Sequence, residues 1–312
     1  MATVPFFPES RKAIEDCRPN LCPGAIRGKV DPMSNDRQHE QDLQRLLQSP
    51  SYRLAYKDAD FLSGPKMRAA RMELELMKPE LTFQEHNVRS TIVVFGSTRI
   101  PEPAAAQQKL EHAKTWLAET PNDPRRLRVV ARAERILAHS RYYDAAREFG
   151  RIVSLHGQAG GWTDYVVVTG GGPGMMEAAN RGASDVGAKS IGLNIRLPME
   201  QQPNPYITPE LCFQFHYFAI RKFHFVLRAK ALVAFPGGIG TLDEIFDALA
   251  LRQTSRMQDI PIILFGREYW QQVINFQFLA DEGTIDDEDL DLFRYAETPQ
   301  QAWDMIRRFH RE

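Results

Sequence analysis

The chain has 312 residues, 43% of them hydrophobic, and its 39 lysines and arginines nearly balance 40 aspartates and glutamates for a formal net charge of -1. That length suffices for one large core or two modest ones, whereas the balanced charge argues against a nucleic-acid partner, because general nucleic-acid binders carry a basic excess. No apolar run reaches the roughly 18–20 residues of a membrane span, and no secretory signal begins the chain, so we expect a cytoplasmic protein with no membrane partner.

The N-terminal part of the chain is polar and interrupted by prolines as far as about Pro50, and we expect an arm with one helix at residues 37–47. Residues 65–77 predict an amphipathic helix that ends before Pro79. Its apolar stripe requires a cover from another part of the protein or from a partner subunit. We therefore assign residues 1–88 to a polar arm and helical extension that is accessory to assembly.

Three cysteines, Cys17, Cys22 and Cys212, cannot all pair with one another. A reduced compartment is therefore the simpler interpretation. Cys17 and Cys22 have half of the spacing of a metal site, but no matching Cys or His pair follows nearby. The sequence thus predicts no metal.

Beyond residue 89, short apolar runs alternate with amphipathic segments, as in a sheet whose strands are joined by crossover helices. Strands are predicted at residues 91–95, 165–169, 190–194, 212–215, 231–235 and 260–265. Helices are predicted at residues 174–186, 218–230, 241–253, 267–282 and 299–310. A longer helical stretch, interrupted at residues 121–124, extends the first crossover. We predict an α/β fold for residues 89–312, with a Rossmann-like, doubly wound and mostly parallel sheet.

Two glycine-rich turns follow apolar runs and lead into helical segments. The first is Gly170-Gly-Gly-Pro-Gly174, and the second is Pro236-Gly-Gly-Ile-Gly-Thr241. Glycines at such turns let backbone N–H groups approach an anion closely, and a helix N-terminus adds roughly half a positive charge. Two such turns in one parallel sheet predict a phosphorylated ligand at the carboxyl edge of the strands.

The common nucleotide-binding signatures do not fit these turns. A dinucleotide-binding sheet carries Gly-x-Gly-x-x-Gly after its first strand, whereas the first predicted strand is followed by Gly96-Ser-Thr-Arg99. A P-loop needs Gly-Lys-Ser/Thr at its end, and no lysine follows either turn. The residues therefore disfavour conventional NAD and ATP sites.

The segment Pro236-Gly-Gly-Ile-Gly-Thr-Leu-Asp-Glu244, preceded by the first turn with Met176 and by the pair Arg221-Lys222, resembles the LONELY GUY (LOG) family. The resemblance covers about residues 91–263. It implies a Rossmann-like phosphoribohydrolase that cleaves nucleoside 5′-monophosphates to free base and ribose 5-phosphate. N6-modified AMP, a cytokinin precursor, is a notable substrate of the family, and no organic cofactor is implied.

The resemblance also implies roles for individual residues. Arg221 and Glu244 are the implied catalytic residues, acting at the ribose and the departing base. The implied substrate-binding residues are Gly171, Gly172, Gly174, Lys222, Gly237, Gly238, Gly240 and Thr241. The second cluster is expected to contact phosphate and the first to shape the nucleoside pocket. Family members place the arginine and glutamate near a subunit interface, so a homodimer or larger homo-oligomer is expected.

Several of these residues also have structural interpretations. Thr241-x-x-Glu244 fits a capping box, in which the two side chains satisfy backbone N–H groups at a helix start. Arg221 and Lys222 could lie on a solvated charged face, although their helix is mostly apolar, and a buried cation needs an anionic partner. The roles of Arg99, which follows the first strand, and Glu177, which could offset a helix dipole, stay open.

Two other functions compete with hydrolysis. Related Rossmann-like proteins bind or carry nucleotides or phosphorylated cofactors without chemistry, and phosphate binding alone needs only the second turn. Families of this kind are often labelled lysine decarboxylases. That activity would need a lysine that forms a Schiff base with pyridoxal phosphate, and neither turn has a convincing one nearby. The sequence favours the hydrolase because it carries both Arg221 and Glu244.

Overall fold

The computed structural model describes residues 32–158, 163–198 and 202–311. The chain divides into two compact units, residues 1–62 and 63–312. In the first unit, the helix predicted at residues 37–47 lies within a longer helix, α1 (Pro32–Gln48). Two 3₁₀ turns, η1 (Pro50–Tyr52) and η2 (Ala55–Lys57), lead to α2 (Ala59–Ser63) at the boundary of the units. Cys17 and Cys22 lie outside the described residues.

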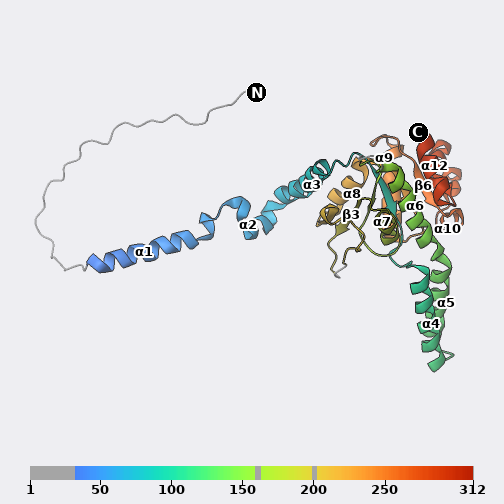
Figure 1. Ribbon diagram of the computed structural model, residues 1–312, viewed down its shortest axis with the longest axis horizontal. Coiled ribbons are helices and arrows are strands. Elements are labelled where there is room, and N and C mark those ends of the chain that lie inside the picture. The colour runs from blue at the N-terminus through green and yellow to red at the C-terminus, as the bar shows by residue number, and fades with distance from the viewer. Residues whose placement is uncertain (1–31, 159–162, 199–201, 312) are drawn as a thin grey trace, which may run out of the picture. The chain divides into compact units, whose positions relative to one another are not determined.

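The second unit is built on a parallel sheet, which confirms the predicted fold class (Figure 1). Its described strands are β1 (Thr91–Phe95), β2 (Val166–Thr169), β3 (Ser190–Ile195), β4 (Cys212–Phe215), β5 (Ala229–Ala234), β6 (Ile262–Phe265) and β7 (Arg294–Ala296). They lie in the order β4-β3-β2-β1-β5-β6-β7, and every pairing is parallel. The sequence missed β7, because three residues are too few to show a strand pattern.

Helices cover both faces of the sheet, so the central strands read as continuous apolar runs. One face packs against α6 (Arg141–Gly157), α7 (Met175–Ser184) and α12 (Pro299–His310). The other packs against α8 (Phe218–Leu227), α9 (Ile239–Gln253), α10 (Arg267–Val273) and α11 (Phe276–Asp281). The single helix predicted at residues 267–282 is thus two helices. The side chain of Asn275 begins the second one by accepting a hydrogen bond from the Phe278 N–H at 3.1 Å.

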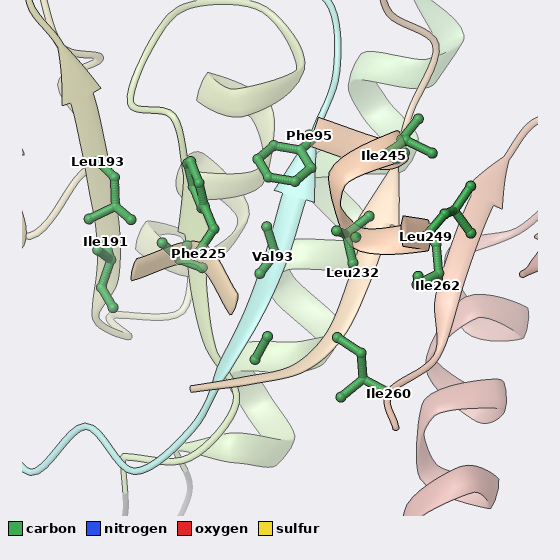
Figure 2. Packing of buried hydrophobic residues seen from close by; sticks show 14 of the residues in the cluster. Val93, Phe95, Ile191, Leu193, Phe225, Leu232, Ile245, Leu249, Ile260 and Ile262 are labelled. Carbon is green, nitrogen blue, oxygen red and sulfur yellow. The ribbon is translucent and has the colours of Figure 1, made fainter. Parts of the chain in front are cut away.

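Alternate side chains of β1 enter the two cores. Val93 and Phe95 pack with Leu232 and Phe225 on the α8–α9 face (Figure 2), whereas Ile92 and its alternate neighbour Val94 belong to the core under α6 and α7. Each fully buried side chain of this size contributes roughly 1.5–3 kcal/mol. Strand β1 is therefore the rigid centre from which the turn after Phe95 is presented.

The first crossover contains a helical hairpin, α4 (Pro103–Glu119) and α5 (Pro124–His139), where the sequence predicted an interrupted helical insertion. Figure 1 shows the two helices side by side, extending away from the sheet. The Asp123 side chain caps α5 by accepting a hydrogen bond from the Arg125 N–H at 2.8 Å. A small cluster of Leu110, Ala113 and Val130 forms the core of the hairpin, separate from the two cores of the sheet.

Helix α3 (Arg68–Glu85) lies in the second unit, within the segment that the sequence assigned to the extension. It follows a 3₁₀ turn at Pro65–Met67 and continues through Pro79, so the expectation that Pro79 ends the helix is wrong. A proline removes the N–H that would bond to the carbonyl four residues earlier. Here that carbonyl belongs to Glu75, and it accepts a hydrogen bond from His224 Nε2 at 3.2 Å instead.

Candidate functional site

A cavity of about 540 Å³ opens where the order of the strands reverses, between β1 and β5. Ligands of open α/β sheets bind at such switch points, outside the carboxyl ends of the strands. Residues 96–99 after β1 line one side of this cavity, and residues 238–241 after β5 line the other. The two turns are joined by a hydrogen bond from the Ser97 N–H to the Pro236 carbonyl at 3.0 Å.

The second glycine turn forms the start of α9. Gly238 is the N-cap residue of this helix, and no side chain among the described residues caps it. A Cβ atom added to Gly238 or Gly240 would meet no described atom within 4 Å, so the space in front of the turn is open. Gly237 differs, because its Cβ would lie 2.1 Å from the Thr241 hydroxyl oxygen. The Gly237 carbonyl also accepts a hydrogen bond from the Tyr269 hydroxyl at 2.7 Å, which fixes the turn from behind.

The start of α9 also decides the structural alternative for Glu244. A capping box requires Thr241 to be the N-cap residue. Because α9 begins at Ile239, Thr241 lies inside the helix. Thr241-x-x-Glu244 is therefore not a capping box, and Glu244 is placed one turn further along, at the wall of the cavity.

Arg221 and Glu244 form an ion pair on this wall, with Nη1 and Oε1 3.6 Å apart and each side chain only 11% exposed. Arg221 comes from α8, and its Nε donates a hydrogen bond to the carbonyl of Leu193 in β3, at 2.7 Å. Its guanidinium also lies over the Phe225 ring, 5.0 Å from the centroid. These contacts give a nearly buried cation one orientation, with remaining N–H groups available to the cavity.

Burial raises the pKa of the Glu244 carboxyl to about 7, against the opposing effects of Arg221 and Lys222. Burial likewise lowers the pKa of Arg221, and the Glu244 charge partly offsets that shift. A carboxyl group with a pKa near neutrality can exchange a proton during a reaction at cellular pH. The pair therefore combines a fixed cation with a group suited to acid–base chemistry.

Met176, in α7 just after the first glycine turn, lines the cavity, whereas the glycines of the turn do not. The Asn204 side chain donates to the carbonyls of Gly171 and Gly172 at 3.2 and 3.1 Å, and all three groups are buried. A Cβ atom on Gly174 would lie 2.3 Å from the Ser97 carbonyl oxygen. This turn supports the turn after β1 from behind, and a direct contact of its glycines with substrate stays a prediction.

Lys222 lies beside the ion pair but faces another way. Its ammonium pairs with Asp243 at 2.9 Å and with Asp247. It lines a neighbouring cavity of about 370 Å³ between α8 and α9, which shares Phe95 and Glu244 with the first. Its role in substrate binding stays a prediction.

Some residues at the cavity were missed or left open by the sequence. Arg99 lines it and was undecided, whereas Glu177 accepts a hydrogen bond from the Tyr143 hydroxyl at 2.8 Å, between α6 and α7. Phe218, the first residue of α8, lines the cavity as well. A clue was available for Phe218, because it lies three residues before Arg221, one helical turn along the same face. The Asn204 contacts have no motif that could reveal them.

Other parts of the molecule offer weaker sites. A larger cavity of about 650 Å³ lies beside β7, but the Arg267 and Arg294 side chains that line it are exposed. Within the described ranges, no group of three or more His, Cys, Asp or Glu side chains could hold a metal ion. Among the helices described here, none combines the length and the hydrophobicity of a membrane-spanning segment.

Comparison with known proteins agrees with the motifs. Residues 176–306 match the model of a family described as "Possible lysine decarboxylase", the LOG family, which confirms the resemblance stated above. No curated protein matches the chain. Among solved structures, the chain is similar to the molybdenum cofactor binding protein from the phototrophic bacterium Rippkaea orientalis, at 21% identity over 54% of this chain and 87% of that one, with a TM-score of 0.39. It is also similar to the structural genomics target TM1055, at 24% identity over 70% of this chain and 99% of that one, with a TM-score of 0.44.

Proposed function

We propose that this chain, which resembles the LOG family and matches the family model over residues 176–306, hydrolyses the N-glycosidic bond of a nucleoside 5′-monophosphate. AMP or an N6-modified AMP, a cytokinin precursor, is the proposed substrate, and free base and ribose 5-phosphate are the products. The observation that carries the proposal is the buried Arg221–Glu244 pair at 3.6 Å, in the same cavity as an open glycine turn.

The charges of the cavity favour one orientation of the substrate. The 5′-phosphate is assigned to the turn at Gly238, Gly240 and Thr241, where the backbone N–H groups of the α9 N-terminus attract an anion. A carboxylate about 6 Å from a phosphate would cost roughly 3 kcal/mol at an effective dielectric constant of 20. Glu244 is therefore assigned to the sugar, which places C1′ and the base toward Arg221.

In the proposed reaction, the bond between C1′ and the base nitrogen breaks and its electron pair leaves with the base. The ribose passes through an oxocarbenium-like transition state, which the Glu244 carboxylate stabilises. Water adds to C1′, and its proton passes through Glu244 toward the departing base. Arg221 stabilises the negative charge on that base. Binding energy from the phosphate, which is remote from the reacting bond, holds the ribose in place.

This site does not support the decarboxylase activity that the family description suggests. A Schiff-base lysine must lose its proton to act as a nucleophile. Burial alone would lower the pKa of Lys222, but hydrogen bonds to Asp247 and Asp243 raise it above its usual value. Lys222 is thus held as a cation, and we retain the hydrolase.

The proposal includes a cytoplasmic homodimer or larger homo-oligomer, as the family resemblance implies. Large apolar side chains are exposed on α8 and α9, namely Phe218, Phe223, Leu227 and Phe246. Exposed apolar side chains next to one another are typical of an interface, and Phe223 and Leu227, one helical turn apart on α8, fit that pattern. Sedimentation of the purified protein should give more than the mass of one chain.

The test of the proposed function is release of ribose 5-phosphate from a panel of nucleoside monophosphates. AMP or N6-substituted AMP should be cleaved, and the corresponding nucleoside should react far more slowly because it lacks the phosphate. Equal rates on AMP and adenosine would contradict the phosphate assignment. Tight nucleotide binding without product would support a binding or carrier protein instead.

A further inference from the structure

Helix α8 carries Arg221 but begins without a cap of its own. Its N-cap residue is Tyr217, which makes no side-chain cap bond, and its first turn holds no acidic residue among the described side chains. The first N–H groups of any helix lack partners within that helix. An element that supplies those partners therefore controls where α8 begins.

Helix α3 supplies a partner at the N-cap residue, Tyr217, and at the residue before it. The carboxylate of Glu75 accepts hydrogen bonds from the backbone N–H groups of His216 and Tyr217, at 2.8 and 3.1 Å. A glutamate does the same within a capping box, where it accepts from the N–H of the N-cap residue of its own helix. Here the glutamate comes from a helix about 140 residues earlier in the chain. Arg71, one turn before Glu75, also donates from Nε to the Tyr217 hydroxyl at 3.3 Å.

Two hydrogen bonds connect Glu75 to Arg221. Glu75 holds the N–H of Tyr217 at 3.1 Å, and the carbonyl of Tyr217 accepts the N–H of Arg221 at 3.2 Å. The side chain of Arg221 ends in the guanidinium that pairs with Glu244. A shift of the Tyr217 backbone would therefore move the Arg221 side chain relative to Glu244.

The backbone of Glu75 makes a second contact that depends on Pro79. Because proline has no N–H, the Glu75 carbonyl lacks its helical donor, and His224 Nε2 lies 3.2 Å away. A carbonyl only accepts, so Nε2 carries the hydrogen in this contact. The His224 ring is buried, with Phe83 of α3 and Phe215 at its sides. The proline thus creates a docking point for α8 in the middle of α3.

Helix α3 also holds the C-terminal end of α8, through an ion pair between side chains. Arg228, the C-cap residue of α8, pairs with Glu80 of α3 at 2.6 Å, and each side chain is 19% exposed. Helix α3 therefore contacts α8 at its beginning, at His224 in its middle and at its end. Ion pairs this well enclosed are costly to leave with one partner missing.

We propose that Glu75 is a positioning residue, which fixes the start of α8 and through it the place of the Arg221 guanidinium in the cavity. This inference rests on the proposed function, because it assigns α3 a part in that reaction. It makes α3 a component of the active unit, where the sequence predicted only an accessory to assembly. The α3 segment would then be needed for turnover in every assembly state.

The test compares Glu75→Ala with Glu73→Ala, an exposed glutamate two residues away on the same helix. Because a displacement of about 1 Å can cost roughly a hundredfold in rate, we expect Glu75→Ala to lower kcat by about ten- to a hundredfold, with a smaller change in KM. Glu73→Ala should match the wild type. Glu75→Gln keeps one acceptor oxygen and should restore part of the lost kcat.

Hydrogen exchange at the amides of residues 217–221 separates this inference from the proposed function. Faster exchange in Glu75→Ala than in Glu73→Ala supports the contact even if the wild type releases no ribose 5-phosphate. Unchanged exchange, or a lower melting temperature with kcat unchanged in the folded protein, would overturn the inference. If Glu75→Ala does not fold, the same two readouts on Glu75→Gln decide the question.

Discussion

The two glycine turns look alike in sequence and differ in what their glycines do. In the first turn, Gly171 has a φ of +74°, and a Cβ there would lie 2.3 Å from the Asn194 side-chain oxygen. In the second turn, Gly238 and Gly240 have no described atom within 4 Å of that position. The space at Gly171 is thus filled by the protein, and the space at Gly238 and Gly240 is left open.

This difference separates two reasons for a glycine. A positive φ and a close neighbour are reasons internal to the fold, since any other residue would be strained there. An open position next to a helix N-terminus has no such reason, and glycine in a helix lowers stability relative to alanine. Gly238 and Gly240 therefore point to a ligand that approaches the backbone closely, whereas Gly237 is required by its contact with Thr241.

The largest effect is expected when the Arg221–Glu244 ion pair beside the open turn is removed by substitution. Glu244→Gln keeps the size of the side chain and removes its charge, and we expect turnover to fall by about 10²–10⁴-fold with the fold intact. Arg221→Ala should have a comparable effect. Ribose 5-phosphate release measures the loss, and circular dichroism checks the fold. Glu268→Gln, an exposed glutamate on α10, is the matched control.

Near-wild-type turnover in either variant would contradict the catalytic role assigned to the substituted residue. The open turn would then be a binding site alone. A loss of turnover that follows a loss of folded protein would show only that the pair stabilises the site, because removing one partner of a buried pair is destabilising.

A pair of glycine substitutions tests the distinction directly. Gly240→Ala should raise the KM for AMP by about 10–200-fold, the effect of one misplaced carbon in a fitted site, while leaving stability unchanged or raising it by up to about 1 kcal/mol. Gly171→Ala should instead lower the melting temperature, because alanine at a φ of +74° is strained by roughly 1–2 kcal/mol. Thermal melts and steady-state kinetics of both variants measure the two effects.

Crossed outcomes would reverse the assignment of the two turns. If Gly171→Ala raises KM at full stability, the first turn contacts substrate itself. If Gly240→Ala unfolds the protein without changing KM in the folded fraction, the second turn is glycine-rich for reasons of folding.

The smallest expected effect is on the pH profile. The proposed reaction needs the ionised Glu244, whose pKa is raised by burial to about 7. Below that pH, kcat/KM should rise by about tenfold per pH unit, and it should level off above it. Lys222 favours the ionised carboxylate, so Lys222→Ala should move the midpoint to higher pH. A profile that is flat or falls between pH 5.5 and 8 would contradict the role of Glu244 as a base.

The fold class and the alternation of strands β1 to β6 with helices along the chain were predictable, because these strands and the glycine turns are local patterns. The helix predicted at residues 299–310 coincides with α12 (Pro299–His310). Features that depend on partners far along the chain were not visible. Pro79 stays inside a helix because His224 bonds the carbonyl that it frees. Lys222 is held by Asp243 and Asp247 because α8 and α9 lie side by side.

The catalytic hypothesis was reached through a motif rather than through geometry. The spacing of Arg221 and Glu244 in the sequence does not predict that they pair. The guanidinium is oriented by the carbonyl of Leu193 in strand β3, which no local pattern reveals. The raised pKa of Glu244 likewise comes from burial in the finished fold. Sequence patterns thus singled out residues that line the candidate site, and tertiary contacts determine its electrostatics.

The α4–α5 hairpin has a consequence for how the chain tolerates change. Its buried cluster of Leu110, Ala113 and Val130 is separate from both cores of the sheet. A segment stabilised mainly by its own contacts unfolds as a local cooperative unit, at a lower free energy than the strands. The hairpin can therefore vary in length or composition without disturbing β1, and the crossover is a permissive place for inserting a further module.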